Sequence, residues 1–230
     1  MELAKRLAAL AAYVPAGGIA ADIGTDHAYL PIFLIEAGIS EKVIATDLNP
    51  GPLESAKRAV EKRHLEDHVD LRLGDGLKTL LPGEAEVLVL AGMGGNTIKE
   101  ILAAGPGVLK SVNRLVMQPM ADAGDLRIWL AGNGWKIIGE KLVDEDGRLY
   151  QIVVAEPGRE LFDDKLCLEL GPRLIEGRDP LLNAYLGKII EQYERALSGM
   201  ASGKNNAARE KAGLLKNKLE RIRKVVGRCL

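Results

Sequence analysis

Short apolar runs alternate with segments of helical periodicity over the first two thirds of the chain. The runs at 17–24, 42–47, 86–95 and 114–119 end in glycine, aspartate or proline, which is typical of buried parallel strands. The run at 69–76 alternates apolar and polar residues and also predicts a strand. Helices are predicted at 2–13, 27–38, 49–63, 96–104 and 122–133.

The segments 135–143 and 149–155 follow the last of these helices and predict an antiparallel hairpin around the turn DEDG. Alternating strands and helices, followed by a hairpin, indicate an α/β fold with a parallel sheet covered on both faces. Ligands of such sheets bind beyond the carboxyl ends of the strands, near the point where the strand order reverses. We therefore expect the functional site in the loops that follow the strands.

The alternation stops near residue 158. Residues 158–180 mix charged residues with Gly and Pro and predict a linker with a short docking segment. Residues 181–198 and 206–226 have helical periodicity, and the stretch between them predicts a turn. The C-terminal part is therefore predicted to be an antiparallel helical hairpin.

Charge divides the chain in the same way. Residues 180–230 carry eleven Lys and Arg against four Glu, a net charge of +7, and the formal net charge of −1 leaves −8 on the rest. The expected division is a domain at 1–158 and a second, basic part at 159–230. A basic helical tail is typical either of a surface that contacts phosphate or of a solvated helical face.

Composition narrows the class of protein. Aromatic residues make up only 4%, which is low for a β-sandwich or a carbohydrate-binding surface. Cys167 and Cys229 match neither a metal site nor a disulfide framework, so a reducing, cytoplasmic compartment and no metal are expected. No apolar run reaches 18 residues, so no membrane span is expected. The sequence leaves the oligomeric state open, a monomer included.

The loop after the first strand contains Asp22, Gly24, Asp26 and His27. A dinucleotide-binding loop would need glycines where Asp26 and Tyr29 stand, and Asp26 would repel a pyrophosphate. Acidic residues instead suit a cofactor with a positive centre and no phosphate, such as S-adenosylmethionine. Asp22 and Asp26 could bind its ammonium group, although Asp22 could also cap a turn.

Further acidic residues follow the next two strands. Asp47 ends the second strand, where a carboxylate can accept hydrogen bonds from both ribose hydroxyls. Asp75, in GDG, could accept from the adenine amine or cap a turn. Four acidic residues at the same edge of the predicted sheet favour the interpretation that they bind the cofactor. His27 is a candidate base, a ligand of substrate phosphate, or a residue hydrogen-bonded by the backbone of the next helix.

The loop AGMGG (91–95) leaves the middle of the predicted sheet. Its three glycines would let a flat substrate or the methionine part of the cofactor approach closely, and a helix capped by Asn96 is a compatible structural interpretation. Gln118 ends the next strand and places an amide beside that loop. Gln118 is a candidate for binding the edge of a base, or a structural hydrogen-bonding residue.

These motifs resemble those of one family. ADIGTDHAYLP (21–31), ATDLNPGPL (45–53), GDGL (74–77), AGMGG (91–95) and MQP (117–119), followed by a basic helical hairpin, are similar to the TrmK family of bacterial tRNA (adenine(22)-N(1))-methyltransferases. The resemblance covers the whole chain. The string GTDHAYLP is specific, because class I methyltransferases in general carry GxGxG there. Family members often read QPN where this chain has Gln118-Pro119-Met120.

The resemblance implies a Rossmann-like class I methyltransferase domain with a C-terminal coiled-coil hairpin, S-adenosyl-L-methionine as cofactor and tRNA as partner. Together with the chemistry above, it points to Asp26, Met93, Gly94 and Gln118 as catalytic residues. The cofactor-binding residues would be Asp22, Gly24, Asp26, His27, Asp47, Leu48, Asp75, Gly76 and Gly92.

The implied reaction needs little chemistry from side chains. N1 of neutral adenine has a lone pair that can attack the sulfonium methyl in line, so positioning dominates and no general base is required. Asp26 would favour the cationic product, and the base must be extruded from the folded tRNA. The hypothesis for the tail is that Lys216, Lys218, Arg221, Arg223 and Lys224 contact the tRNA backbone.

Three alternatives stay open. The first is a methyltransferase of a small molecule or another RNA, in which the hairpin serves dimerisation. The second is a non-enzymatic RNA-binding protein that retains a methyltransferase fold, against which the acids on the rim argue. The third is a nicotinamide-dependent dehydrogenase, which Asp26 disfavours.

Overall fold

A computed structural model of the 230-residue chain describes residues 3–162, 164–200 and 206–229. The predicted turn at 198–206 and the side chain of Cys229 lie largely or wholly outside the described residues. Among the helices that are described, none is both long enough and apolar enough to cross a membrane.

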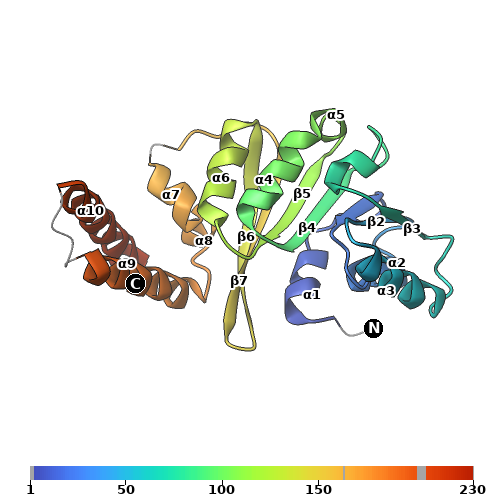
Figure 1. The fold of residues 1–230 in the computed structure, drawn as a ribbon, viewed down its shortest axis with the longest axis horizontal. Coiled ribbons are helices and arrows are strands. Elements are labelled where there is room, and N and C mark those ends of the chain that lie inside the picture. Colours follow the sequence, from blue (N-terminus) through green and yellow to red (C-terminus); the bar gives the residue numbers. More distant parts are fainter. Residues whose placement is uncertain (1–2, 163, 201–205, 230) are drawn as a thin grey trace. The chain divides into compact units, whose positions relative to one another are not determined.

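Within the described part of the chain, seven strands form one sheet in the order β3-β2-β1-β4-β5-β7-β6 (Figure 1). The first five strands pair in parallel, and the hairpin of β6 and β7 joins them antiparallel to β5. The strand order reverses between β1 and β4, which defines the switch point. The strands are β1 (Ala20–Ile23), β2 (Val43–Asp47), β3 (Val69–Leu73), β4 (Val87–Met93), β5 (Arg114–Pro119), β6 (Trp135–Glu145) and β7 (Arg148–Pro157).

Helices cover both faces of this sheet, which explains why its central strands are continuously apolar. On β4, Leu88 and Leu90 pack with residues of α4 and α6, whereas Val87 and Val89 pack with residues of α1 and α2. The N-terminal unit contains α1 (Lys5–Ala11), α2 (Tyr29–Glu36), α3 (Pro50–Glu61), the 3₁₀ turn η1 (Gly76–Thr79), α4 (Gly95–Ala104), α5 (Pro106–Leu109), α6 (Ala123–Gly132) and α7 (Lys165–Leu170).

The segment predicted to be mostly linker contains α7, and a buried ion pair helps to fix it. Arg127 and Glu140 pair with fully buried side chains, and Arg127 Nη1 also donates to the carbonyl of Glu169 in α7, at 3.1 Å. The backbone N–H of Arg173 donates to Glu140 Oε2 at 2.8 Å. The compact units are accordingly Met1–Arg173 and Leu174–Leu230, so the division falls later than residue 158.

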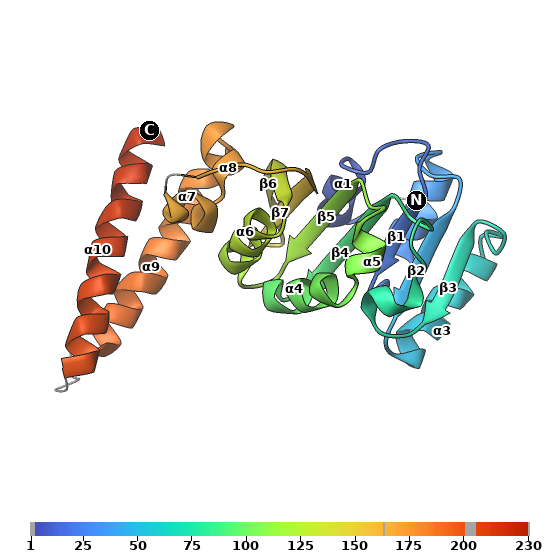
Figure 2. The same ribbon diagram turned by 90° about the horizontal axis from the view of Figure 1, so that it is seen from above.

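The C-terminal unit consists mainly of two long helices, α9 (Leu182–Met200) and α10 (Asn206–Cys229), preceded by the end of α8 (Pro172–Glu176). Figure 2 shows α9 and α10 side by side as a hairpin. Arg223 Nη2 of α10 lies 2.6 Å from Glu194 Oε1 of α9, and Lys218 Nζ lies 5.5 Å from the ring centre of Tyr193. The predicted helical hairpin and the predicted Rossmann-like sheet are both confirmed.

Candidate active site at the carboxyl ends of the strands

A cavity of about 630 Å³ opens at the carboxyl ends of β1, β2 and β4, next to the switch point. We call it the rim cavity. Strand ends and the loops after them supply most of its wall, and α4 closes one side. The predicted site residues that line it are Gly24, Asp47, Leu48, Asp75, Gly76, Gly92 and Met93.

The loop after β1 is bent toward β2 by backbone hydrogen bonds. The N–H groups of Gly24 and Thr25 both donate to the carbonyl of Thr46, at 2.8 and 2.9 Å. Gly24 has a φ of +80°, and a Cβ built on it would lie 3.0 Å from Cε of Met93. A glycine is favoured here by the backbone conformation, whereas the flexible end of Met93 would need to move by only a few tenths of an ångström to make room for a Cβ.

The Asp47 carboxylate is held by main-chain donors on both of its oxygens. Oδ1 accepts from the N–H of Asn49 at 2.8 Å, and Oδ2 accepts from the N–H of Asp26 at 3.3 Å. Asp47 is only 8% exposed, yet it lines the rim cavity. Because each carboxylate oxygen has further lone-pair sites, this side chain is oriented to accept two more hydrogen bonds from a ligand.

Asp22 lies behind the rim cavity, on β1, and does not line it. The residue is 6% exposed. Burial raises the pKa of its carboxyl to about 6, and the nearby charge of Asp47 adds to this effect. A cationic ligand close to Asp22 would oppose both effects and favour the carboxylate.

Asp75 and Gly76 form the third side of the rim cavity. Asp75 is exposed, and Nζ of Lys78 lies 2.6 Å from its Oδ2. Gly76 has a φ of +53°, and a Cβ there would come within 3.0 Å of Ile101. The Asp75 carboxylate is therefore held from the side of η1, which leaves Oδ1 as the oxygen for an amine donor.

The glycines at the end of β4 and directly after it are required for different structural reasons. Gly92 sits at an irregularity in the pairing of β4 with β5 and has a φ of +76°. Gly94 is the N-cap residue of α4, so the expectation that Asn96 caps this helix is wrong. Asn96 instead donates to Asp122 Oδ2 at 2.7 Å. A Cβ on Gly95 would lie 2.5 Å from the carbonyl oxygen of Asp122, so Gly95 is needed for packing.

Gln118 is fully buried at the end of β5 and does not line the rim cavity. Its Oε1 accepts from Arg6 Nη1 at 2.9 Å and from the N–H of Gly92 at 3.2 Å. Its Nε2 contacts Sδ of Met120 at 3.4 Å. The side chain thus braces the end of β4 at Gly92, and the role of Gln118 in binding a base stays a prediction.

The residues of this site fit S-adenosylmethionine. The rim cavity offers carboxylates and close backbone, and Lys78, the one Lys or Arg among its described lining residues, is already paired with Asp75. That donor set suits a ligand with a diol, an amine and a positive charge better than one with phosphates. Thr46 also lines the rim cavity with a buried hydroxyl that has no hydrogen-bond partner among the described residues.

Comparison with known proteins decides the family. Residues 3–153 match the family whose description is "Methyltransferase domain". The tRNA (adenine(22)-N(1))-methyltransferase of Bacillus subtilis (strain 168) is 42% identical over 172 residues, which cover 74% of this chain and 72% of that protein. The chain belongs to the TrmK family.

Solved structures of the TrmK family agree with this. The crystal structure of the B. subtilis M1A22 tRNA methyltransferase TrmK is 32% identical, with a TM-score of 0.91 over 98% of this chain and 99% of that chain. A Streptococcus pneumoniae protein solved in complex with S-adenosyl-L-methionine is 35% identical, with a TM-score of 0.88 over 97% and 99% of the two chains. The family predicted from the sequence motifs is therefore confirmed.

Two predicted residues of this TrmK-family chain lie beside the rim cavity without lining it. Asp26 and His27 are exposed, and His27 Nε2 lies 3.6 Å from Asp26 Oδ1. The imidazole also stacks on the ring of Tyr29, with ring centres 5.3 Å apart. Asp26 and Ala28 have φ values of 52° and 55°, in the left-handed region that non-glycine residues seldom adopt.

Sequence reasoning missed several residues that shape the TrmK-family site. Arg6 reaches Gln118 from α1, Lys78 pairs with Asp75, and Thr97 lines the rim cavity from α4. Arg6 and Gln118 are 112 positions apart, and no local pattern links them. Lys78 could have been found, because it follows Asp75 at helical spacing in the η1 turn.

The five basic residues predicted to bind substrate all lie on α10. Four of them, Lys216, Arg221, Arg223 and Lys224, are exposed, and Lys218 is half-buried. Arg223 pairs with Glu194 inside the hairpin. Among the described residues, no group of three His, Cys, Asp or Glu could hold a metal ion.

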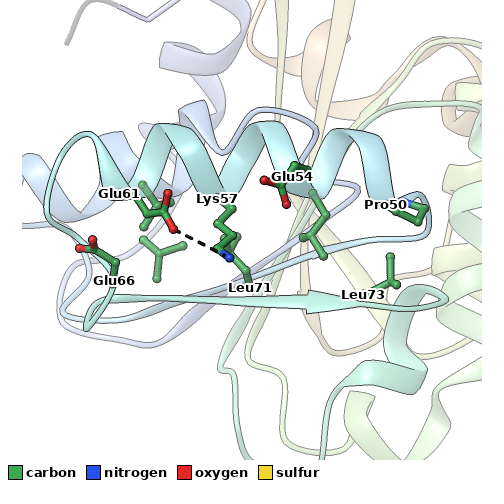
Figure 3. Close-up of a pocket in the computed structure, with 10 residues that line it drawn as sticks. Pro50, Glu54, Lys57, Glu61, Glu66, Leu71 and Leu73 are labelled. Atoms are coloured by element: carbon green, nitrogen blue, oxygen red, sulfur yellow. Dashed lines mark ion pairs between the residues drawn. The ribbon is translucent and has the colours of Figure 1, made fainter.

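A second cavity, of about 480 Å³, lies between α3 and β3 (Figure 3). Leu53, Leu71 and Leu73 contribute apolar surface, and the charged side chains of α3 surround it. Lys57 Nζ and Glu61 Oε1 lie 3.9 Å apart along α3. None of the residues predicted for the site lines this α3–β3 cavity.

Proposed function

We propose that the protein transfers a methyl group from S-adenosylmethionine to N1 of adenine 22 in tRNA. The observation that carries this proposal is the fixed, buried carboxylate of Asp47 in the rim cavity of a TrmK-family chain. A pair of hydroxyl donors is the ligand group that this carboxylate suits, and the ribose of S-adenosylmethionine provides one. The activity is that of the B. subtilis relative.

The remaining cavity residues supply the other contacts. Asp75 Oδ1 would accept from the adenine amine of the cofactor, and Gly76 and Leu48 would lie against the ring. Gly24 and Gly92 let the backbone approach the methionine part. Asp22 and Asp26 add negative charge for the ammonium group and the sulfonium. His27 belongs to the same loop.

When bound, S-adenosylmethionine supplies a methyl group on positively charged sulfur, which the N1 lone pair of neutral adenine can attack in line. The new N–C bond forms as the S–C bond breaks, and the positive charge passes to the adenine ring without loss of a proton. The protein must therefore position the two reactants and exclude water. Met93, which lines the rim cavity, and Gly94, which follows it at the N-terminus of α4, would lie beside the place where they meet. Asp26 would stabilise the cationic product.

The basic face of α10 supports tRNA as the partner. Exposed Lys and Arg side chains on one helix bind a phosphate backbone without reading its sequence, as recognition by shape requires. A tRNA substrate also implies that the protein works in the cytoplasm. Replacing Lys216, Arg221 and Lys224 by Ala should raise the KM for tRNA and flatten its salt dependence, with kcat at saturating tRNA retained.

The decisive experiment uses the full-length protein with methyl-labelled S-adenosylmethionine and tRNA from a strain that lacks the enzyme. We expect 1-methyladenosine in the digested tRNA, at position 22 by primer extension, and no label in a metabolite extract. Label in a metabolite but not in tRNA would instead favour the small-molecule alternative. Calorimetry with S-adenosylmethionine tests the third possibility: both methyltransferase interpretations require binding of this cofactor, whereas a non-enzymatic RNA-binding protein does not.

A further inference from the structure

The amide of Gln118 has a fixed orientation. Its oxygen accepts two hydrogen bonds, from Arg6 Nη1 at 2.9 Å and from the N–H of Gly92 at 3.2 Å. A carbonyl oxygen has two lone pairs, so both are used. Gln118 is fully buried, and its nitrogen faces the sulfur of Met120 rather than the rim cavity.

Gly92 needs this partner because of where it lies. The pairing of β4 with β5 slips between Ala91 and Met93, and such an irregularity leaves a peptide group without its usual partner in the sheet. Gly92 lines the rim cavity and has a φ of +76°. The hydrogen bond from its N–H to Gln118 therefore sets the position of a peptide that a bound methyl donor would contact.

Arg6 is in turn in contact with Glu145, through its backbone and its side chain, and with Tyr150. Its backbone N–H donates to Glu145 Oε1 at 3.0 Å, and its Nε lies 3.8 Å from Glu145 Oε2. Its guanidinium carbon lies 5.4 Å from the centre of the Tyr150 ring. The side chain is only 24% exposed. A long, flexible side chain is thereby ordered on α1, with one donor aimed at Gln118.

We propose that Arg6 is a positioning residue for methyl transfer, which acts through Gln118 to hold the Gly92 peptide at the rim cavity. This inference rests on the proposed function. It also makes Gln118 a positioning residue, because its amide is engaged by Arg6 and Gly92. A displacement of about 1 Å at the Gly92 peptide is enough to misplace the methyl donor and slow the reaction strongly.

Arg114 provides a matched control on the same strand. Arg114 begins β5, whereas Gln118 lies near its end. Its Nη1 donates to the carbonyl of Tyr13 at 3.0 Å and its Nε to Glu156 at 2.9 Å, and its side chain is 26% exposed. Arg114 thus also ties the N-terminal segment to the sheet, but at the edge away from the rim cavity.

The test compares four variants of the full-length protein: Arg6→Met, Gln118→Met, the double variant and Arg114→Met. We expect Arg6→Met and Gln118→Met to lower kcat at saturating substrates at least about tenfold. The double variant should lose no more than the worse single variant, because both act on the same peptide. Arg114→Met should lose a similar amount of thermal stability and keep the wild-type kcat. Wild-type kcat in Arg6→Met, or multiplied losses in the double variant, would overturn the inference.

A second readout does not depend on activity. In ¹⁵N-labelled protein, hydrogen exchange at the Gly92 amide should be at least about tenfold faster in Arg6→Met than in wild type, and unchanged in Arg114→Met. If the wild-type protein methylates no tRNA, the proposed function fails, while Gly92 exchange still decides whether Arg6 acts on this peptide. Unchanged Gly92 exchange in Arg6→Met would overturn the inference even in an active enzyme.

Arg6→Lys serves if Arg6→Met does not fold. Lysine keeps the positive charge beside Glu145 and Tyr150, but its single nitrogen lacks the fork that reaches Gln118 while facing Glu145. Arg6→Lys should fold with near wild-type stability and lie between wild type and Gln118→Met in both kcat and Gly92 exchange. Full wild-type values for both would contradict a role through Gln118.

Discussion

The rim cavity and the α3–β3 cavity are similar in size, at about 630 and 480 Å³, but they are built differently. Strand ends and glycine loops form the rim cavity, and backbone N–H groups fix its central carboxylate. The other cavity is a gap between a helix and an edge strand, and its charged groups are exposed side chains on α3 and at Glu66. Volume alone therefore does not identify a site, whereas a polar group that the backbone holds in one place does.

The largest difference between the two cavities should appear on removing a carboxylate. Asp47→Ala removes the acceptor of two ligand hydrogen bonds to a charged group, each worth about 1.5–3 kcal/mol. We expect kcat/KM for S-adenosylmethionine to fall about a thousandfold. Glu54→Ala, which removes a carboxylate from the α3–β3 cavity, should leave kcat/KM unchanged. Equal losses in the two variants would remove the distinction.

The buried carboxyl of Asp22, behind the rim cavity, should make the stability of the protein depend on pH. Folding raises its pKa from 3.8 to about 6, so the folded chain holds this proton more tightly than the unfolded chain. Below about pH 4 the carboxyl is protonated in both states, and its raised pKa costs no stability. As pH rises to about 6, the raised pKa lowers the free energy of unfolding progressively, and above that pH the loss stays at about 3 kcal/mol. Asp22→Asn should therefore gain stability over wild type as pH rises through this window, measured by urea unfolding. A difference that does not change with pH would contradict the role of burial.

Glycine substitutions at the two cavities should show the same difference with a smaller effect. Gly24→Ala places a Cβ where φ is +80° and where Cε of Met93 is 3.0 Å away. This costs roughly 1–2 kcal/mol of backbone strain, and we expect S-adenosylmethionine to bind about tenfold more weakly by calorimetry. Gly51→Ala, in α3 beside the other cavity, meets nothing within 4 Å and should leave binding unchanged.

The smallest effect is expected at Lys57 of the α3–β3 cavity. Its ion pair with Glu61 is solvent-exposed, with the two side chains spaced four residues apart on one helix. Such pairs contribute about 0.3–0.5 kcal/mol, so Lys57→Ala should change the free energy of unfolding by no more than that. Its methyltransferase activity should equal wild type. A clear loss of activity would show that this cavity takes part in function.

Local pattern predicted the groups that the rim cavity uses most directly. The strand ends follow from hydrophobic periodicity, and the acidic residues at the ends of the first three strands become candidates through the rule that parallel strands bind ligands at their carboxyl ends. Asp47 and Gly24 were predicted in this way and line the cavity, whereas Gly76, which also lines it, was predicted only from the resemblance to the TrmK family. The position of each of these residues in the site depends only on the strand or turn in which it lies, and local sequence patterns predict such elements.

Long-range contacts could not be predicted in this way. Gln118 was a candidate for binding a base, but its oxygen is engaged by Arg6 from a helix at the other end of the domain sequence. Arg127 of α6 is fully buried against Glu140 of β6, and no role was predicted for either residue from the sequence. Both cases depend on which elements the fold brings together, and a charged or amide side chain gives no local signal of its partner.

The anchoring of α7 decides how the methyltransferase unit can be separated from the helical hairpin. A chain cut after residue 158 would lack the Glu169 carbonyl that Arg127 binds and the Arg173 N–H that Glu140 binds. Unsatisfied polar groups at a buried charge pair cost several kcal/mol. A fragment that ends after Arg173 should therefore melt at a clearly higher temperature than one that ends at 158. A fragment intended to test catalysis without the helical hairpin should therefore end after Arg173, whose N–H is hydrogen-bonded to Glu140 of β6.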